Sequence, residues 1–448
     1  MKWVLARRSP FLPCAAVALA LLPGPAPAEW QFDRGDANAD GQRDISDALV
    51  VLEFLFHAGE EPACLDAADA DDSGAVDISD PIVLLGHLFL GAGPLPAPFP
   101  DCGAGRAGGL GCASYPPCEW ESVVAAYGDL STIAGLGARE NDAPVNEWDP
   151  SFEGGPAVDA ELSAPHMAQA DAAGNVFIAD KDAHAIRKVT TDGKIHTVAG
   201  TGSAGDGPDD PGPATQVQLS SPNGLHVRAD STLYILDTGN GKVRRVSPAG
   251  QMSTLFAVPG GISIGRGLWV RDDERLAYVS SGTEVKRRTP EKGVETVATD
   301  FRELGNLAVD PAGRLVVTDR TLHQVYRISG DGKAVAIAGN GDTSGGGDGL
   351  PAIETGLSGV RGVWFLPSGS YFLATHKGSQ VWYVDVRGII HLFLNGKKDA
   401  HSGDGLRFDE PGRKVSEVRA VTVDFAGNVI VTEHDAGFVR KVTRLPGS

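Results

Sequence analysis

Two acidic segments near the N-terminus repeat one arrangement of oxygen-bearing side chains. The segments 36–47 and 69–80 each carry such groups at positions 1, 3, 5, 9 and 12, with glycine at position 6 and the carbonyl of position 7 available as a further ligand. Carboxylates this close together repel one another unless a cation neutralises them, and this order of oxygen ligands with a glycine turn suits Ca²⁺. The alternative is a solvated acidic surface, but two copies of the same spacing favour a metal. We therefore predict two calcium ions, with these ligands: Asp36, Asn38, Asp40, Gln42, Asp44 and Asp47 for the first, and Asp69, Asp71, Ser73, Ala75, Asp77 and Asp80 for the second.

A second set of candidate residues recurs in six similar segments further along the chain. Each residue stands 14 positions before the last residue of a short, mostly apolar stretch, and the set is His166, Asn223, Arg266, Gly305, Arg361 and Arg419. Guanidinium groups present paired donors that suit carboxylate, sulfate or phosphate oxygens. If the six positions meet, the three arginines predict an anionic ligand such as an acidic glycan. The alternative is that they pair with acidic loop residues in 206–210 and 399–409.

The stretches that follow these residues predict the elements that position them. Glycine is abundant, with 58 in 448 residues, and short apolar runs alternate with turn residues. Each unit shows a second strand and a third strand. The expected second strands are 175–180, 232–237, 275–280, 314–319, 370–375 and 428–433, and the third strands are 186–189, 243–246, 285–288, 325–328, 381–384 and 439–442. Many short strands in a repeated unit are typical of a β-propeller, here with six blades.

The ends of this region predict how the ring closes. Fourth strands are recognisable at 195–200 and 334–339, but the last unit ends without one. A matching segment, 130–135, stands alone before the first unit. We therefore expect it to complete the sixth blade. In a closed ring the six candidate residues would each begin an innermost strand at one mouth of the central channel.

The segments 174–180, 185–189 and 197–202 resemble NHL repeats, and the resemblance extends over about residues 129–445. It implies a six-bladed propeller, a fold that serves binding modules and enzymes alike. Gluconolactonase-type propellers and peptidyl-hydroxyglycine amidating lyases hold a catalytic metal in such a fold. Only His166 and Asn223 occupy corresponding mouth positions, so a complete set of metal ligands is not predicted here.

The acidic repeats resemble a type I dockerin module over residues 33–91. Aspartate stands at position 12 of each loop, and one apolar helix is expected after each, at 48–56 and 82–90. The resemblance implies two calcium ions and docking to a cohesin-like partner through Ile45-Ser46 and Ile78-Ser79. The sequence departs from the dockerin pattern at Arg43 in position 8 and Ser73 in position 5.

The N-terminus and the cysteines predict export. Lys2, Arg7 and Arg8 precede an apolar run and an Ala-Pro-Ala site at 26–28, which is the pattern of a secretory signal peptide over residues 1–28. No later run is long enough for a membrane span. In an exported chain Cys64, Cys102, Cys112 and Cys118 predict two disulfides rather than a zinc site. Of the three pairings we favour Cys64 with Cys102 and Cys112 with Cys118.

Charge and composition set the remaining limits. The net charge is −19, of which −14 lies in residues 29–119, and phosphate backbones repel an acidic chain, so nucleic-acid binding is not expected. The expected order is the signal peptide, the dockerin-like calcium module at 29–91, a Gly/Pro/Cys-rich linker or stapled cap at 92–119, and an all-β six-bladed propeller at 120–448. The favoured function is a secreted, calcium-binding, non-catalytic binding or scaffold protein. The alternative is a secreted propeller hydrolase or lyase, lactonase-like or amidating-lyase-like, anchored through its calcium module.

Overall fold

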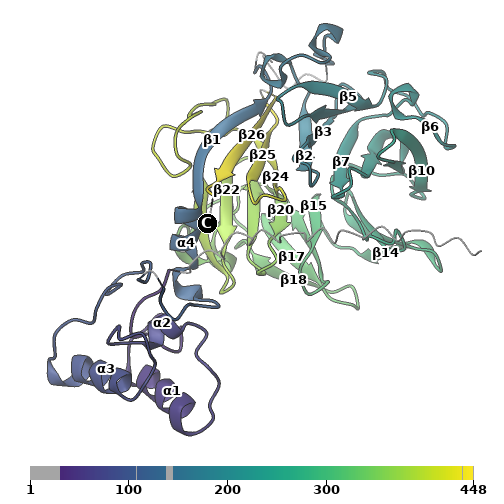
Figure 1. Cartoon of the computed structure of the whole chain (residues 1–448). Coiled ribbons are helices and arrows are strands. Elements are labelled where there is room, and N and C mark those ends of the chain that lie inside the picture. The colour runs from purple at the N-terminus through teal and green to yellow at the C-terminus, as the bar shows by residue number, and fades with distance from the viewer. Residues whose placement is uncertain (1–30, 107, 138–144, 436, 447–448) are drawn as a thin grey trace, which may run out of the picture.

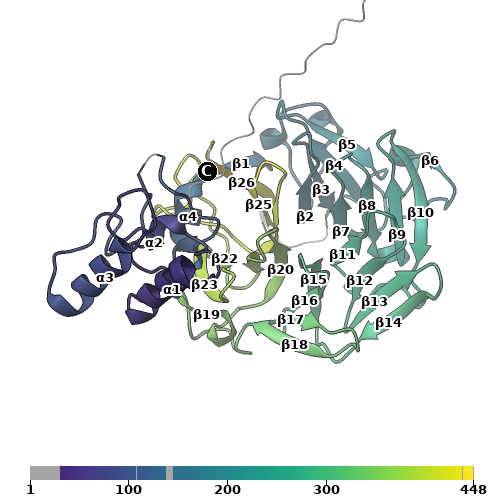
Figure 2. The same cartoon turned by 60° about the horizontal axis from the view of Figure 1, so that its bottom comes forward.

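The computed structural model describes residues 31–446 except 107, 138–144 and 436. The predicted signal peptide lies outside these residues. From residue 127 onward the chain forms six antiparallel sheets arranged in a ring, a six-bladed β-propeller, and a small helical region lies beside it (Figure 1 and Figure 2). The predicted fold class is confirmed.

The innermost strand of each blade contacts the innermost strands of its two neighbours, so these six strands line the centre of the ring. They are, in blade order, β2 (Pro165–Ala170), β7 (Pro222–Val227), β11 (Leu268–Val270), β15 (Leu304–Val309), β20 (Val360–Phe365) and β24 (Val418–Val423). The second strands are β3 (Val176–Asp180), β8 (Leu233–Asp237), β12 (Ala277–Ser281), β16 (Leu315–Asp319), β21 (Tyr371–Thr375) and β25 (Val429–Glu433). The third strands are β4 (Ala185–Val189), β9 (Lys242–Val246), β13 (Glu284–Thr289), β17 (Gln324–Ile328), β22 (Gln380–Val384) and β26 (Phe438–Arg444).

The outer strands complete the blades. They are β5 (Ile195–Ala199), β10 (Gln251–Ala257), β14 (Gly293–Ala298), β18 (Ala334–Ala338), β23 (Ile389–Leu394) and, in the sixth blade, β1 (Tyr127–Ala134). Two short edge strands, β6 (Gly212–Pro213) and β19 (Leu350–Pro351), pair outside β10 and β23. Single 3-10 turns lie in the connections: η2 (Pro150–Phe152), η3 (Ala157–Asp159), η4 (Ala214–Gln216), η5 (Thr238–Asn240) and η6 (Ala352–Glu354).

The second strands are almost continuously apolar because both faces of each blade are covered. Residues of β3, β8, β16, β21 and β25 are buried throughout. Six large apolar clusters of described residues each lie between two neighbouring blades, so the core is divided around the ring. Strand β1 pairs with β26, with Leu130 opposite Val442, which confirms the predicted closure.

The helical region contains α1 (Ile45–Phe56), α2 (Leu65–Ala68) and α3 (Ser79–Leu90), and α1 contacts α3. Both long helices begin three residues before the predicted starts. In α1 the Asp44 carboxylate accepts the N–H of Ser46 and the Asp47 carboxylate accepts the N–H of Asp44, so a capping box fixes the first turn. No helix among the described residues is both long and apolar enough to span a membrane.

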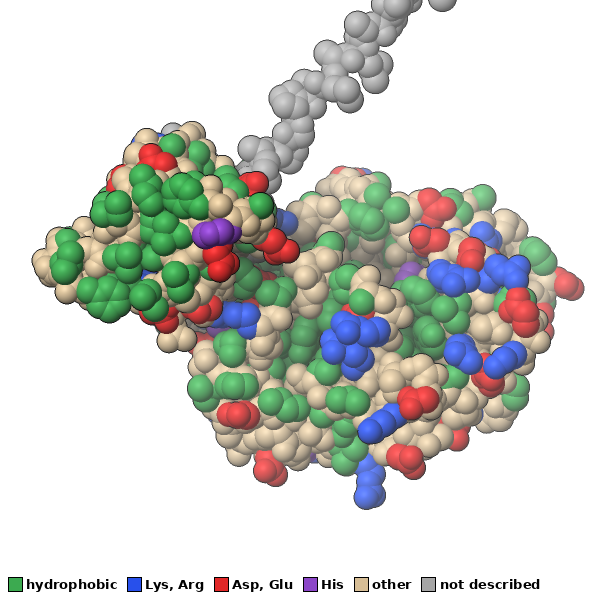
Figure 3. All heavy atoms as spheres, turned by 90° about the horizontal axis from the view of Figure 1, so that it is seen from below, with side chains coloured by type: hydrophobic (Ala, Val, Ile, Leu, Met, Phe, Trp, Pro, Cys, Tyr) green, Lys and Arg blue, Asp and Glu red, His purple; other side chains and the backbone are tan. Residues whose placement is uncertain are grey.

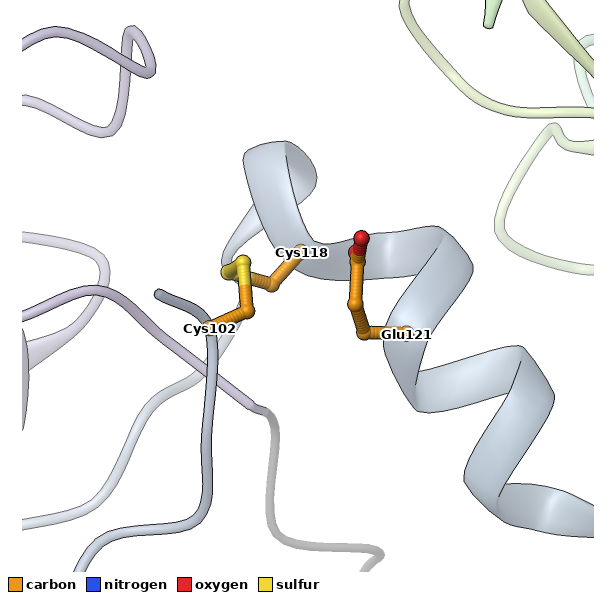
Figure 4. Close-up of side chains that lie close together, drawn as sticks. All are labelled: Cys102, Cys118 and Glu121. Carbon is orange, nitrogen blue, oxygen red and sulfur yellow. A yellow bond between two sulfur atoms is a disulfide. The ribbon is translucent and has the colours of Figure 1, made fainter. Parts of the chain in front are cut away.

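Two disulfides staple this region, and the favoured pairing is wrong. Cys64 is bonded to Cys112, and Cys102 to Cys118. The segment after α3 folds back across the region, so that Cys64 and Cys112 face each other in an antiparallel bridge. The turn η1 (Pro116–Cys118) then brings Cys118 to Cys102, beside Glu121 (Figure 4). Disulfides are typical of extracellular proteins.

Helix α4 (Glu119–Ala126) joins the helical region to the propeller and leads directly into β1. Glu119 is buried, and its Oε1 accepts hydrogen bonds from the hydroxyls of Ser370 and Tyr383 while its Oε2 accepts the N–H of Val386 at 3.2 Å. The Trp120 ring stacks on that of His391, with centroids 4.7 Å apart. These contacts fix α4 against blade five.

Candidate functional site

The predicted mouth residues stand at the starts of the innermost strands. In five blades the pairing with the second strand shifts register at this point, for example between Pro222 and Gly224 and between Val360 and Gly362. Such a β-bulge turns one side chain away from the regular alternation of the strand. The mouth residue is part of the shifted segment each time. In blade three Arg266 precedes β11, and the hydroxyl of Ser280 accepts its N–H.

Small residues next to these positions let the innermost strands approach closely. An added Cβ at Gly224 would lie 2.4 Å from the Arg266 carbonyl oxygen, and one at Gly267 would lie 2.6 Å from the Leu307 nitrogen. Any larger side chain there would push neighbouring blades apart. The register and the close packing together bring mouth residues from several blades to one place.

A pocket of about 740 Å³ opens at this mouth and gathers four of the predicted residues. They are His166, Asn223, Arg266 and Arg419, and Lys181 and His434 lie among the other lining residues. Arg361 stands at the same register but does not line this pocket. Its side chain is 1 % exposed, and its Nε and Nη1 have no hydrogen-bond partner within the described part of the chain. Gly305 offers no side chain, but an added Cβ there would lie 2.8 Å from the Arg361 carbonyl oxygen.

Acidic partners of the mouth arginines come from residues that the sequence analysis did not single out. Arg266 Nη1 lies 3.7 Å from Glu303 Oε1, and Arg419 Nη2 lies 3.6 Å from Glu417 Oε2. Each glutamate stands two residues before the mouth position of its blade, which is the signal that could have identified both. The acids first considered as partners have other contacts: Asp206 and Asp209 pair with Lys242 and Arg244, Asp404 with Arg440 and Asp409 with Arg407.

Each of these two glutamates faces more than one basic group. Glu303 also pairs with Arg320, and Glu417 also lies 3.0 Å from His376 Nε2 and 3.5 Å from Lys398 Nζ. Burial raises the pKa of Glu417, but His376 and Lys398 outweigh burial, so the net pKa is lowered and the carboxylate is charged. Burial and the neighbouring Arg320 lower the pKa of Arg266 to about 10, so its guanidinium keeps its charge at neutral pH.

His166 is neutral at this mouth. Burial lowers its pKa well below the usual range, and the nearby His434, Arg419 and Arg266 lower it further. Its Nδ1 lies 2.9 Å from the Ala164 carbonyl oxygen, which can only accept, so Nδ1 carries the proton and Nε2 keeps a lone pair. Within the described ranges, no group of three closely placed metal-ligating side chains includes a mouth residue.

The two acidic loops have the same internal geometry. The carboxylate at position 1 accepts the N–H groups of positions 5 and 6, as Asp69 does from Ser73 and Gly74. The carboxylate at position 12 accepts those of positions 3 and 9, as Asp80 does from Asp71 and Asp77. The first loop has the equivalent four bonds, to Asp36 from Asp40 and Gly41 and to Asp47 from Asn38 and Asp44.

The predicted ligands at positions 1 and 12 are buried and those at positions 5, 7 and 9 are exposed, in both loops. The exposed set is Asp40, Gln42, Asp44, Ser73, Ala75 and Asp77; Asn38 and Asp71, at position 3, are half-buried. Carboxylate oxygens of Asp69, Asp71 and Asp80 lie within 4.8 Å of one another. Burial raises the pKa of Asp47 and of Asp80 to about 6. Buried carboxylates in this state are those that a bound cation would stabilise.

The loops differ in their surroundings. Tyr115, fully buried in the segment after α3, donates its hydroxyl hydrogen to Asp36 in the first loop. Beside the second loop, the buried Arg34 donates from Nη1 to the carbonyl oxygen of Asp69 and from Nη2 to Asp72 at 3.0 Å. The stapled segment and the loops therefore form one connected structure.

Comparison with known proteins supports the propeller. A family model of the teneurin NHL domain matches residues 124–247. Human teneurin-1 is 31 % identical over 103 residues, which are 20 % of this chain and 4 % of teneurin-1. Mouse teneurin-3 is 40 % identical over 77 residues, 15 % of this chain and 3 % of teneurin-3. The chain thus matches only a small part of the length of these relatives.

Solved structures share the architecture. A protein of unknown function from Bacteroides thetaiotaomicron superposes with a TM-score of 0.55 at 16 % identity, over 71 % of this chain and 76 % of that one. An auxiliary nutrient binding protein from Bacteroides ovatus has a TM-score of 0.53 at 13 % identity, over 71 % and 77 %. At these identities the likeness concerns the fold alone. The match to the NHL family model begins at residue 124, so the dockerin resemblance rests on the loop residues themselves.

Proposed function

We propose that this chain is an exported, calcium-stabilised binding protein whose propeller takes up an anionic ligand, such as an acidic glycan, at the mouth of its channel. The observation that carries the proposal is the convergence of Arg266, Arg419 and Lys181 on one pocket. Asp182 contacts Lys181, and Glu303 and Glu417 are each shared between several basic groups of the mouth.

Arg361 stands at the same register of the ring but outside the pocket. It is a buried guanidinium with two nitrogens that lack hydrogen-bond partners among the described residues, and a buried charge in that state is costly. An acidic ligand would relieve this cost only where it reaches beyond the pocket to Arg361. The pocket volume of about 740 Å³ is large enough for one or two sugar units.

The test compares glycans of different charge on the full mature chain. Polygalacturonate and a sulfated glycan should bind in a salt-sensitive manner, and a neutral glycan should not. Arg266→Gln with Arg419→Gln should weaken binding at least about 10-fold, because each charge-assisted hydrogen bond contributes about 1.5–3 kcal/mol. Arg275→Gln, an exposed arginine on blade three, is the matched control. Equal binding by the double variant, or no binding of any acidic glycan, would refute the proposal.

A hydrolase or lyase remains the second candidate because of His166. Its neutral ring and the lone pair on Nε2 would serve a base or a metal ligand, and Asn223 lies in the same pocket. Turnover of a bound glycan or lactone that His166→Ala abolishes, with folding unchanged, would favour the enzyme over the binding protein.

We further propose that the helical region is dockerin-like and docks a cohesin-like partner. Apolar side chains are exposed in pairs at equivalent positions of the two repeats: Ile45 and Ile78, Leu49 and Ile82, Phe56 and Phe89. Figure 3 shows hydrophobic side chains over much of the visible surface of this region. Two matching apolar surfaces beside two matching loops are suited to a protein partner.

Titration with a cohesin domain tests the docking proposal. Binding should require calcium and should be lost when Leu49→Ser and Ile82→Ser are combined. The control is Val50→Ser, a neighbouring change on a different face of α1. Calcium-independent binding, or binding that survives the double change, would count against a dockerin-like role.

A further inference from the structure

The mouth pocket lined by His166, Asn223, Arg266 and Arg419 is called the anionic-ligand pocket. A second hollow, of about 730 Å³, lies at the opposite ends of the innermost strands. The mouth residues begin β2, β7, β20 and β24, whereas this hollow is lined by the last residues of those four strands. Its other wall is α4, and loops of blades five and six complete it. The lining contributed by strand ends and α4 is Gln169, Ala170, Val227, Phe365, Val423, Ser122, Val123 and Ala126.

The walls of this hollow are mainly apolar, with several aromatic rings. Trp364, Phe365 and Phe425 face it from the loops and strand ends, and Tyr127 and Tyr383 line it beside α4. Phe425 is 62 % exposed, and Trp364 and Phe365 are only half-buried. Aromatic surface in contact with water is unfavourable, and a concave apolar pocket of this size is typical of small-molecule sites.

The polar groups that line the hollow limit which kinds of ligand it can bind. Both Glu119 oxygens are occupied by its hydrogen bonds to blade five. Asp424 accepts the N–H groups of Ala426 and Asn428 and the side-chain amide of Asn428, and Gln169 Oε1 accepts the N–H of Val227. These oxygen atoms therefore already accept hydrogen bonds from within the protein.

Arg444 differs from these groups because no carboxylate pairs with its guanidinium within the described part of the chain. Its side chain is exposed at the rim, and it is the basic group in the lining. A ligand that places an acidic group at Arg444 and a ring system among Trp364, Phe365 and Phe425 would pair with the guanidinium and cover the exposed rings.

We propose that this hollow binds a small amphipathic acid, with a ring-bearing apolar body and one carboxylate or sulfonate paired with Arg444. The site is separate from the anionic-ligand pocket, which is polar and begins at the other ends of the same strands. It does not depend on the function proposed above.

Two fluorescent dyes that differ in charge test the proposal on the full mature chain. 1-Anilinonaphthalene-8-sulfonate carries a sulfonate, and N-phenyl-1-naphthylamine has a similar ring system without a charge. Both should bind saturably. Ala426→Trp, which adds a ring inside the hollow, should weaken both at least about 10-fold, and Arg444→Gln should weaken the sulfonate about 10-fold while changing the neutral dye less than about 2-fold.

Two further variants separate the hollow from other sites. Phe425→Ala changes an exposed side chain and should also weaken both dyes, so the test does not depend on Ala426→Trp folding normally. Leu49→Ser with Ile82→Ser removes apolar surface from α1 and α3 and should leave dye affinity unchanged. Two results would overturn the proposal. One is unchanged dye binding in both Ala426→Trp and Phe425→Ala, and the other is loss of dye binding in Leu49→Ser with Ile82→Ser. Equal losses of the two dyes in Arg444→Gln would overturn the assignment of an acidic ligand.

Discussion

Removal of calcium from the full mature chain is expected to unfold its helical region while the propeller stays folded. Positions 1 and 12 of each loop hold buried carboxylates, Asp36 with Asp47 and Asp69 with Asp80, whose mutual repulsion is relieved by a cation. At free calcium about 100-fold above the dissociation constant, each site would stabilise the folded state by about 2.7 kcal/mol. Apart from the two disulfides, the helices are held together by small apolar clusters.

Calorimetry with and without a calcium chelator measures this effect. Two transitions are expected in calcium, and chelation should move the transition of the helical region to lower temperature and leave the propeller transition in place. Asp36→Ala with Asp69→Ala should remove the response to calcium. Glu60→Gln changes one exposed acid outside both loops and should keep it. A thermogram that is identical with and without chelator would show that the loops do not bind calcium.

The register of the mouth could be predicted from the sequence because each blade repeats one path. The distance of 14 residues from the mouth position to the end of the second strand covers one strand, one turn and one further strand. That spacing keeps its meaning even in blade three, where the repeat is weakest and β11 is only three residues long. Counting residues along the chain therefore predicted that the mouth residues meet. Four of them line one pocket: His166, Asn223, Arg266 and Arg419.

Counting could have marked candidate partners of these residues, but it could not show which of them contact the arginines. Glu303 and Glu417 stand two residues before the mouth positions of their blades, but whether their side chains turn toward the channel depends on bulges at the strand starts. Arg361 shares the register of Arg419, yet it is buried away from the pocket. Which of two equivalent side chains reaches the ligand is decided by packing across the ring, and a single repeat does not contain that information.

The predicted disulfide pairing was wrong for a similar reason. The favoured pairing joined Cys64 with Cys102 and Cys112 with Cys118, whereas the actual pairs depend on how the segment after α3 brings Cys102, Cys112 and Cys118 back toward α2. The bridge of Phe32 with Gly103 and the contact of Tyr115 with Asp36 set that path. These contacts join residues far apart in sequence, with no periodic pattern to reveal them.

Replacement of Leu130 by alanine is expected to destabilise the propeller by about 2–5 kcal/mol, because this side chain is fully buried in the cluster between blades five and six. Leu130 also belongs to the strand that closes the ring. Its N–H donates to the Leu406 carbonyl at 2.9 Å, and it faces Val442 across the β1–β26 pair. A cavity there loosens the contact between the two ends of the propeller chain.

Closure makes this position different from an ordinary core leucine. When β1 detaches, β26 becomes an exposed strand edge, and the mouth loses the support that holds β24 and Arg419 in place. Leu130→Ala should therefore raise amide hydrogen exchange along β26 and weaken acidic-glycan binding, whereas Leu315→Ala, a buried leucine of blade four, should lower stability without the change at β26. If both variants lose the same stability and show the same exchange pattern, β1 is one strand among many and the ring does not depend on it for closure. If only Leu130→Ala frees β26, the blade completed by the two chain ends is the point at which the propeller opens.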